Sequence, residues 1–148
     1  MVALLAAAAV YVGAAIANFT RLHPLEYIAV NALAGGIRGA YGKFELDYWA
    51  AAATEALRHL EKQVDEEAPD LFARNPPSVV VCIRYREYLA GIMTRRPWKI
   101  EEDAAKADFV IETERSRCAQ PGYTLIDKVT RADRAFAWTW KRKSFHGW

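Results

Sequence analysis

The chain has few of the residues from which metal and cofactor sites are commonly built. It has two cysteines, Cys82 and Cys118, without a CxxC pair, and three histidines, His23, His59 and His146, without HxxxH or HExxH spacing. Zinc sites draw their ligands from such clusters. We therefore expect no metal site and no bound cofactor.

Motifs for nucleophilic catalysis and nucleotide binding are also missing. No GxSxG occurs, so no serine stands in a nucleophile elbow. Gly36, Gly39 and Gly42 follow a G-x-x-G-x-x-G spacing that differs from the dinucleotide fingerprint, and Gly42-Lys43-Phe44 lacks the Ser or Thr of a P-loop. These glycines are more simply explained as permitting tight turns of the backbone.

Charge of one sign is not in excess. Twenty Lys and Arg residues stand against eighteen Asp and Glu residues, which leaves a formal net charge of +2. A nucleic-acid-binding domain usually concentrates basic residues on one face, so we expect no nucleic-acid partner. The hydrophobic content of 53% is high enough for a folded core and excludes wholesale disorder.

Residues 2–19 contain no charged side chain at all. A helix rises about 1.5 Å per residue, so about 17 apolar residues are near the lower limit for crossing a bilayer. We favour a membrane span or membrane-associated helix over residues 1–22. A secretory signal is an alternative because Ala15-Ile16-Ala17 has the small-x-small cleavage form, although no Lys or Arg opens the segment. A buried helix of a soluble protein is the third possibility.

The orientation of such a helix is set by competing signals. No basic residue precedes the run, whereas Arg21, Arg38 and Lys43 follow it. The positive-inside tendency alone would place the following domain in the cytoplasm, but long domains translocate largely regardless of charge. We expect a membrane protein whose soluble part is extracytoplasmic.

The remaining periodicity predicts an α/β fold. Helices are expected over residues 25–33, 46–64 and 86–93, and the glycine-punctuated residues 35–42 are expected to form a loop. Strands are expected over residues 79–83, 98–101 and 108–111, followed by an antiparallel hairpin of residues 123–129 and 135–141. The result is a small mixed sheet with a βαβ unit and a C-terminal hairpin. Residues 23–77 and 78–148 are the two parts of one globular unit, 23–148.

Two clusters allow a structural and a functional interpretation. Glu45 and Asp47 can serve acid–base chemistry, but capping of the following helix by Asp47 is the simpler explanation. Trp138 and Trp140 share one face of the last strand by the two-residue alternation and precede a basic stretch. They form sheet core, a membrane-interface belt or a base-stacking platform, and the first is the simplest explanation.

The cysteines are either two small buried thiols or one disulfide, which requires an oxidising compartment. Cys82 ends the first predicted strand, and Cys118 follows the third. Both can lie at the carboxyl edge of one sheet, so we predict a Cys82–Cys118 contact with Cα atoms within roughly 7 Å.

Residues 23–49 carry a family resemblance. The segment has His23-Pro24, Tyr27, Asn31, Gly35-Gly36, Gly39-Ala40, Gly42, Phe44-Glu45 and Asp47-Tyr48-Trp49. It resembles the stretch after the last transmembrane helix in bacterial GT-C glycosyltransferases of the dolichyl-phosphate-mannose-protein mannosyltransferase-like group. Shorter matches follow at Thr54-Glu55-Ala56, residues 107–111, Arg115 and Cys118. One departure is Ala50, where the family usually has glycine.

The resemblance implies that the chain corresponds to the last membrane helix and the C-terminal extracytoplasmic domain of such an enzyme. Relatives of this kind transfer a sugar from a polyprenyl-phosphate carrier, and their catalytic acidic residue lies in an upstream loop that this sequence lacks. The expected function is therefore an accessory domain that is not catalytic on its own. Its expected partners are the membrane, the polytopic region of the transferase and a lipid-linked sugar.

The resemblance and the residue types together suggest an edge that faces the membrane active site. Its candidate residues are His23, Arg38, Glu45, Asp47, Tyr48 and Trp49. Arg38 and His23 can approach a phosphate, and Tyr48 or Trp49 can stack on a sugar ring. The alternative is a non-enzymatic binding or interaction module, membrane-tethered or secreted, whose glycine- and aromatic-rich segment docks a partner protein. A soluble cytoplasmic nucleotide-binding enzyme is the third hypothesis and predicts solubility without detergent.

Overall fold

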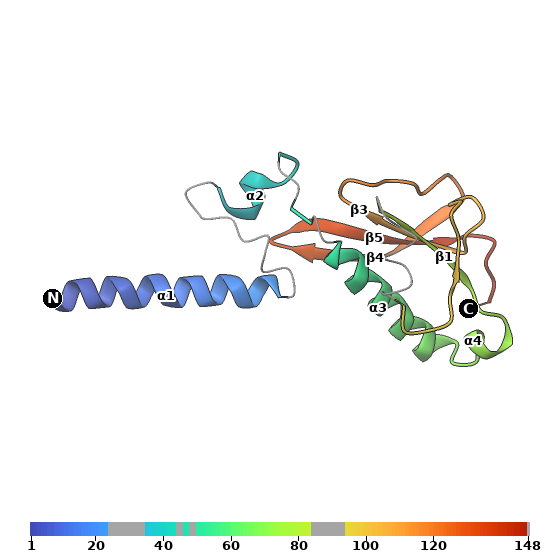
Figure 1. Cartoon of the computed structure of the whole chain (residues 1–148), viewed down its shortest axis with the longest axis horizontal. Coiled ribbons are helices and arrows are strands. Elements are labelled where there is room, and N and C mark those ends of the chain that lie inside the picture. Colours follow the sequence, from blue (N-terminus) through green and yellow to red (C-terminus); the bar gives the residue numbers. More distant parts are fainter. Residues whose placement is uncertain (24–34, 44–45, 48–49, 84–93, 148) are drawn as a thin grey trace.

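The computed structural model describes residues 1–23, 35–43, 46–47, 50–83 and 94–147 (Figure 1). It has an N-terminal helix, further helices and a five-stranded mixed sheet, so the predicted α/β class is confirmed. The helices expected over residues 25–33 and 86–93 lie outside the described residues. The second of them is the helix of the predicted βαβ unit.

The sheet joins a parallel half to an antiparallel half. Its strands are β1 (Ser78–Cys82), β2 (Lys99–Ile100), β3 (Phe109–Thr113), β4 (Tyr123–Arg131) and β5 (Arg134–Arg142), in the order β2-β1-β3-β5-β4. β1 pairs in parallel with β2 and β3, whereas β5 pairs antiparallel with β3 and β4. The predicted C-terminal hairpin is thus confirmed, and its turn places Ala132 and Asp133 at positive φ.

The core lies on both faces of the central strands. Every residue of β1 and β3 is buried, as their continuous apolar runs predict. Phe109 and Ile111 belong to the larger core on the α3 side, whereas Val80 and Val110 pack with Ala104 and Ala107 in a smaller cluster. Both faces of the sheet are therefore closed to water over its centre.

Helix α3 (Ala51–Glu67) covers the larger face of the sheet. Its apolar face carries Leu57, Leu60 and Val64, each at most 1% exposed, and contacts β3, β4 and β5. The expected start at residue 46 is wrong, because Asp47 and Ala50 lie outside the helix. Residue 50 has φ 53° and ψ 32°, which is left-handed backbone and breaks the helical path before Ala51.

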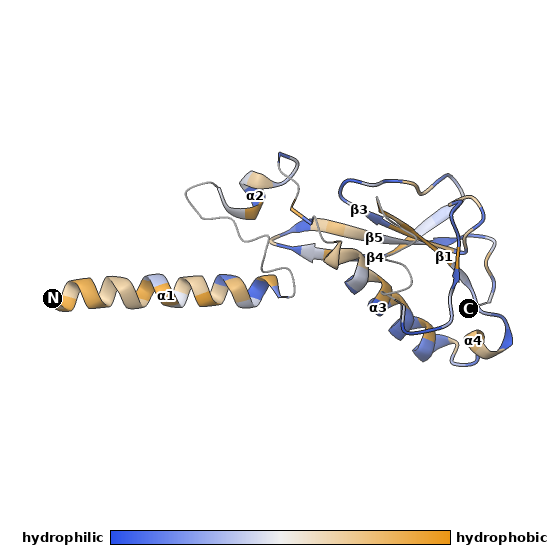
Figure 2. Cartoon of the chain, viewed as in Figure 1, coloured by the Kyte–Doolittle hydropathy of each residue, from blue (hydrophilic) through white to orange (hydrophobic). Residues whose placement is uncertain are grey.

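Helix α1 (Val2–Leu22) projects away from the rest of the molecule (Figures 1 and 2). It is 21 residues long, and its most apolar 18-residue window has a mean hydropathy of 2.0 with none of its residues buried. Only Leu22, at 2% exposed, enters the core. Among the residues that the structure describes, α1 is thus the one helix whose length and composition suit a membrane anchor or a signal sequence.

Two short helices complete the described structure. Residues 36–40 form α2 (Gly36–Ala40) rather than a plain loop, with Gly35, Gly36 and Gly42 at positive φ around it. The expectation of an irregular segment there was wrong for these five residues, because glycines in left-handed backbone admit one helical turn between them. Helix α4 (Leu71–Arg74) is a single turn in the connector before β1.

Strand directions give the domain two distinct ends. Thr113 at the carboxyl end of β3 pairs with Ala137, close to the β4–β5 turn, and β1 runs parallel to β3. We call this the proximal end; it holds the β4–β5 turn, α2, the start of α3 and the exit of α1. The distal end holds α4, the amino ends of β1 and β3, and residues 143–147.

Candidate functional site

The predicted edge residues that the structure describes lie at the proximal end. The backbone carbonyl of His23 accepts a hydrogen bond from Arg131 Nη2 at 2.7 Å. Arg38 forms an ion pair with Asp133, and its Nε donates to the carbonyl of Ala132 at 3.4 Å. Residues 23 and 38 are thus brought to the same β4–β5 turn. Glu45, Tyr48 and Trp49 lie outside the described residues.

Asp47 holds the start of α3. Its carboxylate oxygens accept hydrogen bonds from the backbone N–H groups of Ala51 at 2.9 Å and Ala52 at 3.1 Å. The first N–H groups of a helix have no partner within it, so this carboxylate satisfies two of them and its charge suits the helix dipole. The N-cap residue is Ala50 rather than the predicted Asp47, but the Asp47 carboxylate does bind the first N–H groups of α3 from four residues before the helix.

Arg131 ties the exit of α1 to the domain. Its guanidinium Nη2 lies 2.8 and 3.0 Å from the two carboxylate oxygens of Glu55 on α3, while it also donates to the carbonyl of His23. The side chain is only 14% exposed, so this pair is better shielded from water than an ordinary surface salt bridge. His59 extends the cluster, with Nδ1 at 2.9 Å from Asp127 Oδ2.

The α2 segment is fastened to the sheet by its C-terminal residues. The Tyr41 hydroxyl donates to the carbonyl of Ala135 at 2.6 Å, and its ring packs edge-on against Phe136 with centroids 5.7 Å apart. The N–H of Gly42 donates to Glu114 Oε1 at 3.1 Å. Burial, followed by the negative charge of Glu114, raises the pKa of Tyr41, so its hydroxyl remains a donor at neutral pH.

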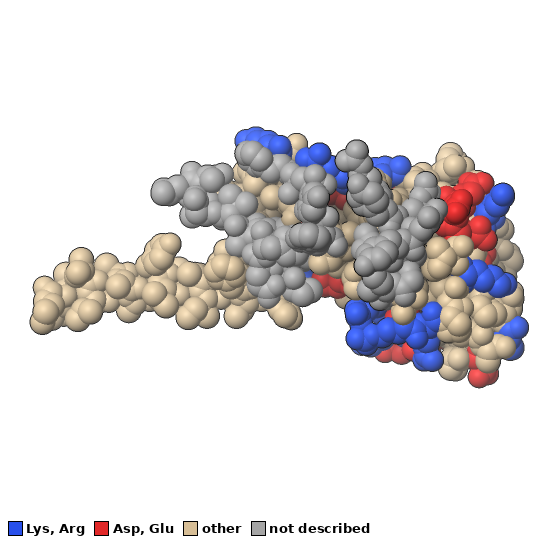
Figure 3. Space-filling view, viewed as in Figure 1, with Lys and Arg blue, Asp and Glu red and all other residues tan. Residues whose placement is uncertain are grey.

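Exposed charge at the proximal end is mainly positive. Arg38, Lys43, Arg115 and Arg134 are exposed around α2 and the β4–β5 turn, where Asp133 is the exposed acidic residue among the described positions. In Figure 3 blue atoms lie beside α2 along the upper edge, a further blue group lies over α3 at the lower edge, and the end opposite α1 shows red and blue together. Among the described residues, the exposed charge around α2 and the β4–β5 turn is therefore mainly positive.

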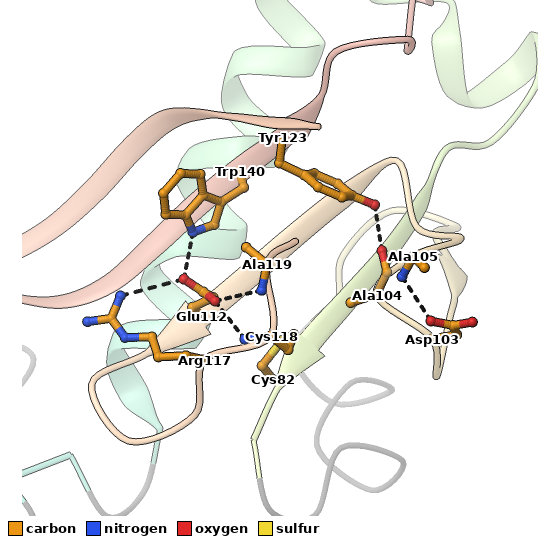
Figure 4. Close-up of a disulfide and its surroundings, with 10 residues drawn as sticks. All are labelled: Cys82, Asp103, Ala104, Ala105, Glu112, Arg117, Cys118, Ala119, Tyr123 and Trp140. Carbon is orange, nitrogen blue, oxygen red and sulfur yellow. Dashed lines mark hydrogen bonds and ion pairs between the residues drawn. A yellow bond between two sulfur atoms is a disulfide. The ribbon is translucent and has the colours of Figure 1, made fainter. Parts of the chain in front are cut away.

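The predicted contact between Cys82 and Cys118 is confirmed, with Cα atoms 6.1 Å apart, and of the two alternatives the structure has the disulfide (Figure 4). Cys82 ends β1 and Cys118 lies in the segment after β3, as expected. The bridge closes a sequence separation of 36 residues. A disulfide of this kind persists in oxidising compartments, which agrees with a membrane-tethered or secreted extracytoplasmic domain.

Glu112 anchors the segment that carries Cys118, a role that the sequence prediction missed. Its side chain is 4% exposed, and its carboxylate accepts hydrogen bonds from the N–H groups of Cys118 at 2.6 Å and Ala119 at 2.7 Å and from Trp140 Nε1 at 2.8 Å (Figure 4). Arg117 lies 3.5 Å from the same carboxylate. The available signal was one acidic residue directly after the apolar Phe109–Ile111 stretch of a buried strand.

Glu61 plays the same part on the other side of the sheet. It is 5% exposed, and its Oε1 accepts from the N–H groups of Arg95 at 2.8 Å and Arg96 at 3.1 Å and from Trp98 Nε1 at 3.2 Å. Asp65 forms a 2.6 Å ion pair with Arg96 and raises the pKa of that guanidinium. Both buried glutamates therefore hold loops in place.

A cavity of about 480 Å³ lies at the distal end, between α4 and the C-terminal residues. Its charged walls include Asp108 and Arg142. Asp108 Oδ2 accepts from the Ser78 N–H and hydroxyl, and Arg142 donates to the carbonyls of Ala105 and Ala107. These side chains serve the fold, and the cavity contains none of the predicted edge residues.

Within the described ranges, no three His, Cys, Asp or Glu side chains are grouped so that they could hold a metal ion. Comparison with known proteins found no matching family model, no similar curated protein and no similar solved structure.

Proposed function

We propose that this chain is a membrane-anchored extracytoplasmic accessory domain of a glycosyltransferase that uses a polyprenyl-phosphate-linked sugar. The observation that carries the proposal is a convergence: His23, Arg38 and Asp47, from the segment that carries the resemblance, all lie at the proximal end. This end is also where α1 leaves the domain. A domain anchored by α1 would present it to the bilayer, where a lipid-linked sugar has its phosphate.

Position 50 supports the same interpretation independently. The resemblance places glycine after the Asp-Tyr-Trp triplet, and Ala50 is found in left-handed backbone with φ 53°. That conformation favours glycine because it has no Cβ. This chain therefore has alanine at position 50, although the backbone there has the conformation that suits the glycine of the resembling family.

The proposed role of the domain is to position the substrate rather than to catalyse the reaction. The contacts of the described acidic residues fit this role. Asp47 caps α3, Glu55 pairs with Arg131, and Glu61 and Glu112 hold loops through backbone N–H groups. Each of these carboxylates serves an interaction within the fold. The chemistry of sugar transfer then belongs to the membrane region of the complete enzyme.

The test is transfer of sugar by a complete homologue that carries changes at the positions corresponding to Arg38 and Asp47. We expect Arg38→Ala to lower transfer roughly 10-fold or more, because a charge-assisted hydrogen bond to phosphate is worth about 1.5–3 kcal/mol. Asp47→Ala should lower transfer by loosening the start of α3. Arg74→Ala at the distal end is the matched control and should leave transfer unchanged. Full activity of both proximal variants at normal expression would refute the proposal.

The second candidate is a membrane-tethered or secreted binding module that docks a partner protein. It is favoured by the completeness of the domain, which closes both faces of its sheet and adds a disulfide without help from another chain. Affinity purification from solubilised native membranes separates the two candidates. The accessory role predicts recovery of a polytopic membrane protein, whereas the module predicts recovery of a soluble one.

A further inference from the structure

We propose that the proximal end docks directly on the headgroups of an anionic phospholipid bilayer. The surface consists of Arg38 and Lys43 beside α2, Arg115 after β3, and Arg134 at the β4–β5 turn, which we call the basic rim. The inference rests on the membrane anchoring in the proposed function but adds a second contact with the membrane. With this second contact the domain lies against the bilayer, instead of being attached to it through α1 alone.

The connection between α1 and the rim limits how far the rim can move from the bilayer. Leu22, the last residue of α1, is buried in the core at 2% exposed. The carbonyl of the next residue is held by Arg131, two residues before the β4–β5 turn reaches Asp133. Arg38 in turn is paired with Asp133. The rim is thus attached through a few direct contacts to the point where the apolar helix ends.

The distribution of exposed charge indicates that the partner of the basic rim is negatively charged. Among the described residues of this end, the four exposed basic side chains stand against one exposed acidic residue, Asp133, and Arg21 in the last turn of α1 adds a further positive charge. The distal end is mixed instead. Its exposed basic residues Arg74, Lys99, Lys106 and Lys143 are interspersed with Glu66, Glu67, Asp70, Glu102 and Asp103. Of these two ends, as far as the structure describes them, the proximal one complements a negatively charged surface.

The rim side chains are available for phosphate groups. The ion pair between Arg38 and Asp133 has 65% and 78% of its two side chains exposed, so water screens it and Arg38 can exchange to a lipid phosphate. A Lys or Arg near an anionic leaflet gains about fivefold in binding, and the gain falls off within roughly 8–10 Å at physiological salt. Contact of the rim with the headgroups is therefore required for the effect.

The experiment uses the full chain in nanodiscs of neutral phosphatidylcholine and in nanodiscs with about 30% phosphatidylglycerol. Hydrogen exchange is followed at residues 36–43 and 130–134. We expect exchange there to slow about tenfold in the anionic discs, because several rim residues contribute together. The slowing should disappear at about 1 M salt, where the screening length is near 3 Å. Equal exchange in the two discs would overturn the proposal.

Two variants with equal loss of charge sharpen the result. The quadruple change Arg38→Gln, Lys43→Gln, Arg115→Gln and Arg134→Gln should abolish the lipid dependence. The quadruple change Arg74→Gln, Lys99→Gln, Lys106→Gln and Lys143→Gln should retain it. All eight residues are exposed, so folding is retained in both variants. An equal loss in the distal variant would show that net charge, not the rim, is responsible.

Failure of this inference can be told apart from failure of the proposed function. A chain that does not stay with either nanodisc contradicts the membrane anchoring on which both depend. A chain that stays with both, with exchange that ignores the lipid headgroup, contradicts rim docking alone. Lipid-dependent protection together with normal sugar transfer by both the Arg38→Ala and the Asp47→Ala homologues contradicts the accessory role and leaves rim docking intact.

Discussion

Helices α1 and α3 are of similar length but are stabilised by different surroundings. Helix α3 buries seven of its 17 residues on one face and exposes charged residues on the other. Helix α1 buries one of its 21 residues and is apolar on all sides. An amphipathic helix is completed by the protein surface it covers, whereas a helix that is apolar all round requires an apolar environment. The comparison shows that α3 is built to lie on the sheet, whereas the length and composition of α1 suit a membrane anchor or a signal sequence.

This difference also separates their contributions to stability. Most of the stability of a helix in a protein comes from packing of its apolar face rather than from helix propensity, so α3 depends on the sheet beneath it. Helix α1 makes almost no contact with the domain, so its stability depends on what surrounds it. Changes in α3 should therefore affect unfolding of the domain, and changes in α1 should affect association with the membrane.

The largest expected effect comes from truncating the buried face of α3. Leu57 is 0% exposed, so Leu57→Ala should lower the free energy of unfolding by about 2–5 kcal/mol through lost burial and a cavity. The matched change in the other helix is Leu5→Ala, at a side chain that is 64% exposed, and it should have no measurable effect. Denaturant titration in mild detergent measures both. Equal losses would show that α1 packs on the domain.

The next effect concerns the domain alone. Replacing Cys82 and Cys118 together by alanine should lower the free energy of unfolding by roughly 4 kcal/mol, from the entropy of an open loop of about 36 residues in the unfolded chain. Association with membranes should not change, because α1 does not contact the bridge. The two measurements are denaturant titration in detergent and extraction of membranes with alkaline carbonate. An unchanged midpoint would contradict the stabilising role of the bridge.

A charge placed inside α1 should have the opposite profile. Val10 lies mid-helix and is 73% exposed, so Val10→Arg should leave unfolding of the domain unchanged. It should disfavour insertion by about 2.5–3.5 kcal/mol, which is enough to release an alanine-rich helix near the length limit. Alkaline carbonate extraction of membranes measures the loss, with Thr20→Arg at the end of the helix as control. Retention of the Val10→Arg variant would argue against a bilayer-spanning α1.

The elements that sequence predicts best are those with a strong local pattern. The buried strand β1, the hairpin and the apolar α1 all follow from runs or alternation within about ten to twenty residues. The contacts that build the proximal end join residues far apart, such as Arg38 with Asp133, separated by 95 positions, and Arg131 with residue 23, separated by 108. No periodicity encodes such pairs, because they depend on the strand order and on where each turn falls.

Two carboxylates of the domain, those of Asp47 and Glu112, show the same division. Capping by Asp47 could be predicted because a carboxylate just before a helical pattern is a local signal. The anchoring role of Glu112 could not, because its partners lie in the following loop and on β5 and come together only in the sheet. A polar residue in an apolar strand indicates that its side chain has hydrogen-bond partners, but it does not indicate which groups these are.

The smallest predicted effect tests how α3 begins, where α1 offers no counterpart. Ala50 has φ 53°, and a residue with a Cβ is disfavoured there. Ala50→Gly should therefore raise the free energy of unfolding by up to about 1 kcal/mol, reduced by the loss of a methyl group that is 6% exposed. The control is Ala53→Gly, in the first turn of the helix, which should lower stability by about 1 kcal/mol because glycine is a poor helix former. Thermal unfolding in detergent distinguishes the two by the sign of the shift. If both variants lost stability equally, residue 50 would not be left-handed, and the match between its backbone and the glycine of the resembling family would have no physical basis.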